Sequence, residues 1–106
     1  MKIILAFIVS LSFSSVLFAK APVKHSLGSV LYTSCKFCHG FKGEKIYNKE
    51  IPAINNLDKE ALISILNLYK KGELDTYGYG GIMKMQMTNI SVKLIPILAK
   101  YIKDIK

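Results

Sequence analysis

The sequence predicts a small all-α domain with three main helices. Three segments of the 106-residue chain, within 26–40, 58–72 and 91–103, repeat apolar side chains three and four residues apart, which is the period of a helix with one buried face. Loops that contain glycine or proline separate these segments, and the alternation typical of strands is weak throughout. A chain of this length has room for one domain at most.

The first 19 residues are interpreted as a secretory signal peptide that precedes the domain. Lys2 gives a positive start, residues 3–11 are almost continuously apolar, and Ala19 offers a small residue at the cleavage point. An uncleaved anchor helix is the alternative, but the apolar run is short and broken by serines for a span of roughly 20 residues. Cleavage leaves residues 20–106 as the mature domain, which we expect to have no stable membrane span.

The first helix of the domain is expected to begin after Ser26, whose side chain suits the N-cap position. The helical spacing is carried by Leu27, Val30, Leu31 and Ser34. This helix is expected to run into Cys35 and to end near Gly40, because glycine is common just after a helix. Residues 40–57 are then an irregular loop.

The second helix has the clearest boundaries, with Asp58 as N-cap and Gly72 as the stop. Residues 73–89 are expected to form a second loop. The last helix has Ile95, Leu98, Ala99 and Ile102 on one face. If Ser91 is its N-cap, Pro96 deletes a backbone hydrogen bond, whereas a start near Ile95 accommodates the proline, so we expect a distorted or late start.

The segment Cys35-Lys-Phe-Cys38-His39 holds the only two cysteines of the chain. Its C-x-x-C-H pattern is the attachment signature of a c-type haem. Residues three and four apart share a helix face, so two thiols and one imidazole can point at the same flat group. Cys35 and Cys38 would then form the thioether bonds, and His39 would be the proximal iron ligand. The expected cofactor is one covalent haem c, with the three helices wrapped around it.

Two other chemistries use a pair of cysteines at this spacing. A thioredoxin-like redox dithiol belongs beside a βαβ pattern, and none is visible here. A structural zinc site needs four ligands, and the only other histidine is His25, ten residues before Cys35. Export also fits haem attachment, because exported thiols otherwise become disulfides. We therefore expect a compartment with haem-attachment machinery, the bacterial periplasm. With 87 residues left after cleavage, the apoprotein is expected to be largely unfolded.

The formal charge is +8 and falls to +7 without Lys2. Four lysines flank the cysteine motif: Lys36, Lys42, Lys45 and Lys49. They could steer the protein toward an acidic redox partner, or they could be ordinary solvated residues of a lysine-rich chain. A nucleic-acid partner is not expected, because the sequence has no basic helix and no RNA-binding motif.

Three methionines, Met83, Met85 and Met87, compete for the sixth position on the iron. A methionine thioether there raises the reduction potential and suits electron transfer, whereas a vacant site allows ligand binding or catalysis. Methionine is more often core filler in a domain of this size, but a loop bounded by glycines is a poor place for core filler. The residues alone do not choose among the three.

The chain resembles the class I cytochromes c, especially the short bacterial single-haem type. The resemblance covers nearly all of residues 26–103. It is carried by GSVLYTSCKFCHG at 28–40, IPAI at 51–54, LDKEALISILNLYKKG at 57–72, MKMQMTNIS at 83–91 and IPILAKYI at 95–102. It implies that the backbone carbonyl of Pro52 accepts the free N–H of the His39 ring. The family's ligand methionine lies eight residues before the helix-capping serine, which selects Met83, while a shared Met-Thr-Asn string selects Met87 as runner-up.

The resemblance implies a periplasmic, monomeric one-electron carrier with His/Met-ligated iron that makes and breaks no substrate bond and so is not an enzyme. It would exchange electrons with respiratory redox proteins. Two further hypotheses stay open: a haem-bearing subunit of a larger oxidoreductase, and a gas-binding or catalytic haem protein with an open sixth position.

Overall fold

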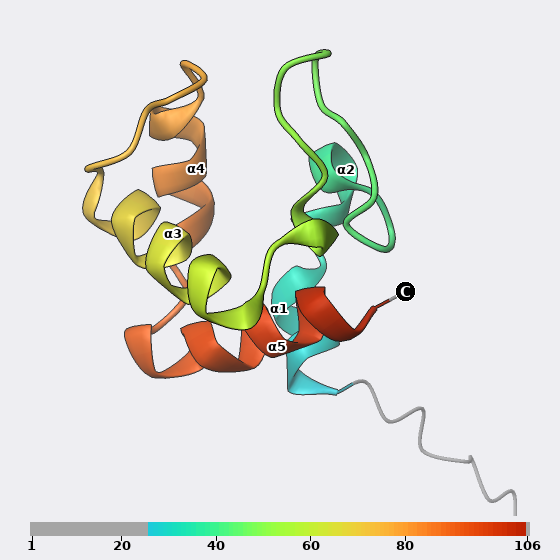
Figure 1. Ribbon diagram of the computed structural model, residues 1–106. Helices are drawn as coiled ribbons and strands as arrows, with labels where there is room; N and C mark the ends of the chain where they lie inside the picture. Colours follow the sequence, from blue (N-terminus) through green and yellow to red (C-terminus); the bar gives the residue numbers. More distant parts are fainter. Residues whose placement is uncertain (1–25, 106) are drawn as a thin grey trace, which may run out of the picture.

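The computed structural model describes residues 26–105, and these residues form helices and loops without a strand (Figure 1). The helices are α1 (Leu27–Tyr32), α2 (Lys36–His39), α3 (Lys59–Lys71), α4 (Gly80–Met87) and α5 (Ile95–Asp104), with short 3-10 turns η1 (Ile54–Asn56) and η2 (Val92–Leu94). The all-α prediction is confirmed for the described part of the chain. The predicted signal peptide, residues 1–19, lies outside the described residues.

The expected first helix is two helices separated by a turn. Ser26 caps α1 as predicted, because its Oγ accepts a hydrogen bond from the Ser29 N–H at 3.1 Å. The helix then stops at Tyr32, and Cys35 becomes the N-cap residue of α2. Gly40 ends α2 with φ at 87°, a value that favours glycine. The prediction of one continuous helix into Cys35 was therefore wrong, although the end at Gly40 is confirmed.

Both ends of α3 lie where the sequence places them. The Asp58 carboxylate accepts the Ala61 N–H at 2.7 Å and satisfies one of the free donors of the first turn. At the other end, Gly72 adopts a left-handed conformation, and its N–H bonds back to the carbonyls of Leu68 and Tyr69.

The helix α4 was not expected, because residues 73–89 were predicted to be a loop. Its first turn is tied down by Asp75, whose side chain accepts the Gly80 N–H at 2.8 Å. The residues that follow the two glycines are Ile, Met, Lys and Gln, most of them strong helix formers. Their propensity outweighs the pair of glycines at the start, so three methionines of the predicted loop are helical.

The start of the last helix combines the two options that the sequence left open. Ser91 caps η2, with its Oγ 3.4 Å from the Lys93 nitrogen, and the proper helix α5 begins only at Ile95. Pro96 therefore falls in the first turn of α5, where the missing N–H has no intrahelical partner to lose. The predicted distorted, late start is confirmed.

The core lies where α5 crosses α1 and α3. In Figure 1, α5 crosses in front of α1, and above α5 lie α3 and α4 on one side and α2 with its following loop on the other. The buried apolar residues are Tyr32, Leu62, Leu66, Met87, Ile90, Ile95, Leu98, Ala99 and Ile102. The crossing of α1 over α5 is close, because a Cβ on Gly28 would lie 2.5 Å from the Tyr101 Cβ. No helix in the described range is long and apolar enough to cross a membrane.

Candidate functional site

An apolar cavity of about 430 Å³ lies between α2 and α4, and the predicted site residues line its wall. This volume is in the range of small-molecule and cofactor sites. The chemically distinctive side chains on its wall are Cys35, Cys38, His39, Met83 and Met87. Most of the remaining wall is aliphatic: Ile51, Pro52, Ile54, Leu57, Leu62, Ile65, Leu66, Leu74, Ile82 and Ile102. Figure 1 shows α2 and α4 facing each other from the two sides of the molecule.

The short helix α2 brings the two cysteines and the histidine to one wall of this cavity. The N–H groups of Cys38 and His39 donate to the Cys35 carbonyl at 3.3 and 3.0 Å, which closes the turn between the two thiols. Both cysteines are free thiols and half-buried. The shared helix face that the spacing predicts is therefore formed.

His39 is half-buried, and its Nδ1 has no hydrogen-bond partner among the described residues. Burial lowers the pKa of His39, since the charged imidazolium is poorly solvated there. At neutral pH the ring is thus held in its neutral form, which is the form that binds metals. Pro52 lines the same cavity, but its carbonyl does not receive the Nδ1 proton in this structure, so that predicted hydrogen bond stays a prediction.

The two alternative chemistries of the cysteine motif gain no support from this geometry. Burial, with a smaller contribution from Cys38, raises the pKa of Cys35, whereas redox-active dithiols have a lowered thiol pKa. The described residues also contain no cluster of three or more His, Cys, Asp and Glu side chains that could hold a metal ion. A zinc site would lack ligands in this part of the chain.

The three methionines have different surroundings on α4. Met83 is half-buried and lines the cavity, whereas Met85 is 72% exposed and is not part of its wall. Met87 also reaches the cavity, but it is only 1% exposed and belongs to the core. Met83 is the thioether that can move toward a ligand in the cavity without leaving a hole in the core.

Four tyrosines around the cavity were not predicted as site residues: Tyr47, Tyr69, Tyr77 and Tyr79. Burial raises the pKa of Tyr69, so its hydroxyl stays protonated over a wide pH range. The Tyr77-Gly-Tyr79 segment leads into α4. Its place beside the cavity depends on α4, which the sequence did not predict.

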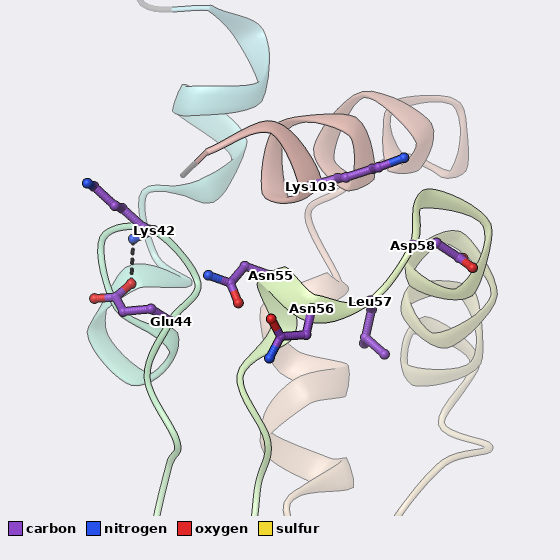
Figure 2. A pocket seen from close by; sticks show the side chains of 7 residues that line it. All are labelled: Lys42, Glu44, Asn55, Asn56, Leu57, Asp58 and Lys103. Atoms are coloured by element: carbon purple, nitrogen blue, oxygen red, sulfur yellow. Dashed lines mark hydrogen bonds between the residues drawn. The ribbon is translucent and has the colours of Figure 1, made fainter.

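A second hollow, of about 610 Å³, lies on the polar surface near η1 and the end of α5 (Figure 2). Its wall is Lys42, Glu44, Asn55, Asn56, Leu57, Asp58 and Lys103. Both carboxylates already accept backbone hydrogen bonds, Glu44 from the Lys42 N–H at 2.8 Å and Asp58 from Ala61. This hollow holds none of the predicted site residues, and the apolar cavity is the better candidate site.

Comparison with known proteins adds no relative. No protein-family model, no curated protein and no solved structure matches the chain. The assignment of a function therefore depends on the cavity and its residues.

Proposed function

We propose that this domain is a single-haem c-type cytochrome that carries one electron at a time. The observation that supports the proposal best is the placement of Cys35, Cys38 and His39 on one wall of an apolar cavity that also contains Met83. Two thiols, an imidazole and a thioether are the side chains that hold a covalent haem and its iron in carriers of this kind.

The cavity fits such a group in size and in chemistry. Its wall is mostly aliphatic, as an apolar porphyrin requires, and burial favours the neutral form of the His39 ring, which is the form that binds metals. When bound, haem c supplies an iron that alternates between the ferrous and ferric states.

The residues of the chain have separate roles in this proposal. Cys35 and Cys38 would hold the group covalently, and His39 and Met83 would be the ligands of its iron. Leu62, Leu66 and the rest of the aliphatic wall exclude water, which favours the less charged ferrous state and raises the reduction potential.

The proposed cellular setting comes from the sequence. The signal peptide and the motif together suggest export to the periplasm. We propose a monomer that meets acidic redox proteins through the exposed side chains of Lys42, Lys45 and Lys49. Intact-mass measurement of the exported protein should give a chain that begins at Lys20 and carries one haem. A retained Met1 would indicate an uncleaved anchor.

The test is the optical spectrum and the acid-acetone extraction of the purified protein. The wild type should keep its haem through extraction and, when oxidised, show the weak near-red sulfur-to-iron band. The double variant Cys35→Ala/Cys38→Ala should lose covalent haem, while the control Phe37→Ala, at a position 74% exposed between the cysteines, should keep it. Covalent haem in the double variant, or none in the wild type, contradicts the proposal.

A further inference from the structure

Two loops from opposite sides of the cavity touch at Tyr47, Asn48 and Tyr79, which we call the clasp. The Asn48 side-chain amide donates a hydrogen bond to the Tyr79 hydroxyl, with 2.7 Å between Nδ2 and Oη. The rings of Tyr47 and Tyr79 meet edge to face, with centroids 5.5 Å apart and planes at 80°. Both tyrosines line the cavity, so the clasp is part of its wall.

The backbone beneath the clasp is strained. Asn48 and Lys49 have φ values of 51° and 63°, in the left-handed region that favours glycine, and they are the only non-glycine residues with positive φ in the described range. The turn is closed by Tyr47 and Ile51, whose backbones exchange two hydrogen bonds of 3.0 Å. Strained non-glycine residues persist where the surrounding structure fixes them, and they concentrate at functional sites.

Backbone hydrogen bonds connect the clasp to the residues proposed as iron ligands. On one side, the Lys45 N–H donates to the His39 carbonyl at 3.0 Å, two residues before Tyr47. On the other side, Tyr79 is the N-cap residue of α4, and its carbonyl accepts the Met83 N–H at 3.0 Å. The clasp thus links the His39 wall to the first turn of the helix that carries Met83.

We infer that the clasp positions Met83 over the cavity and that Asn48 and Tyr79 are positioning residues for the sixth iron ligand. This inference rests on the proposed function. With the clasp closed, the first turn of α4 is held against the loop after His39, and the thioether stays in place. With the clasp open, α4 is free to tilt outward, and a small ligand such as carbon monoxide gains access to the iron.

The experiment compares Asn48→Gly with Lys49→Gly in the haem-loaded protein. Both variants put glycine at a positive φ, so both relieve strain and loosen the unfolded chain in the same way. Only Asn48→Gly removes the amide donor to Tyr79. Lys49→Gly also removes one charge, but carbon monoxide is uncharged, so the difference between the two variants in its binding rate measures the clasp.

We expect Asn48→Gly to bind carbon monoxide roughly fivefold faster than Lys49→Gly in the ferrous state, the change that loss of one ordinary hydrogen bond produces. On heating, the near-red band of ferric Asn48→Gly should also disappear at a lower temperature than the band of Lys49→Gly. Tyr79→Phe, which keeps the ring contact and loses the hydroxyl, should behave like Asn48→Gly and provides a second test if that variant folds poorly.

Equal carbon monoxide rates and equal band stability in Asn48→Gly, Tyr79→Phe and Lys49→Gly overturn the inference. If the wild type still has covalent haem and the near-red band in that case, only the role of the clasp is contradicted, and the proposed function is unaffected. If the wild type lacks covalent haem or the band, the proposal of a Met-ligated electron carrier is contradicted, and with it the assignment of Asn48 and Tyr79 as positioning residues.

Discussion

Met83, Met85 and Met87 occupy one short helix, yet a single substitution at each should have a different effect. Met83→Ala should erase the near-red band, lower the reduction potential and open the iron to carbon monoxide, because the cavity-lining thioether is lost. Met85→Ala should change none of these, since that side chain is 72% exposed. Met87→Ala should keep the band but lower the free energy of unfolding by about 2–5 kcal/mol, since it empties a core position.

Optical spectra and denaturant titrations of the three variants separate these outcomes. Loss of the band in Met87→Ala, with the band kept in Met83→Ala, would make Met87 the ligand. A wild type that binds carbon monoxide readily and has no band would mean that no methionine is bound, and the open-site hypothesis would replace the electron carrier.

Tyr32 should make the free energy of unfolding of the domain fall in the alkaline pH range. Its buried hydroxyl donates to the Gly40 carbonyl at 2.6 Å, and burial raises its pKa from 10.0 to about 12. The neutral phenol is the favoured form in the folded state, so its stabilising contribution is complete below pH 10 and is lost as the pH rises from 10 to about 12. The loss should be on the order of 2 kcal/mol.

Denaturant titrations of the haem-loaded wild type and of Tyr32→Phe at pH 8 and pH 11 measure this contribution. The variant should be less stable than the wild type at pH 8, because one buried hydrogen bond is missing, and it should lose less stability on going to pH 11. The same loss in both proteins would show that Tyr32 does not titrate in this range.

The cysteines and the histidine could be predicted from the sequence because their arrangement is local. Cys35, Cys38 and His39 span little more than one helical turn, so spacing alone places them on one face. The pair Asn48 and Tyr79 lies 31 residues apart, and nothing in either segment indicates the other. Their contact exists only after α4 has formed and the two loops have been brought together by the core.

Among the helices, the crossing of α1 and α5 depends on one glycine. Gly28→Ala places a methyl group 2.5 Å from the Tyr101 Cβ, an atom fixed to the backbone, so the two helices must separate. We expect a loss of about 1–3 kcal/mol in the free energy of unfolding. In the control Gly81→Ala, in α4, the new Cβ meets no described atom within 4 Å beyond its chain neighbours and its own helix backbone, so the domain should stay as stable or become slightly more stable.

Denaturant midpoints of the two haem-loaded variants test the crossing. A Gly28→Ala protein as stable as Gly81→Ala would show that α1 can shift away from α5 without cost.

Helix ends marked by a capping side chain, a glycine or a proline were predictable, whereas α4 and the break between α1 and α2 were not. The boundaries of α3 follow from Asp58 and Gly72, each of which bonds to nearby backbone groups. In α4 the N-cap residue is Tyr79, which has no capping side chain, and two glycines follow it, so the local pattern indicated a loop. The sequence does not mark the break between α1 and α2 either, because residues 33–35 contain no glycine or proline.

At the scale of the whole molecule, the positive charge should affect the rate of electron transfer. The exposed Lys42, Lys45 and Lys49 belong to the loop beside the cavity, and they should attract an acidic redox partner. The rate should fall as added salt shortens the Debye length from about 30 Å to about 8 Å. Stopped-flow measurements over this range test the effect, and a salt-independent rate would leave these lysines as solvated residues without a steering role.

The contribution of α5 to the core sets a requirement for folding. Four of the nine buried apolar residues in the described range lie on α5: Ile95, Leu98, Ala99 and Ile102. Their partners on α1 and α3 lie far earlier in the chain, so the contacts that close the core are of high contact order. A chain without α5 therefore lacks the contacts that close the core and cannot fold this domain.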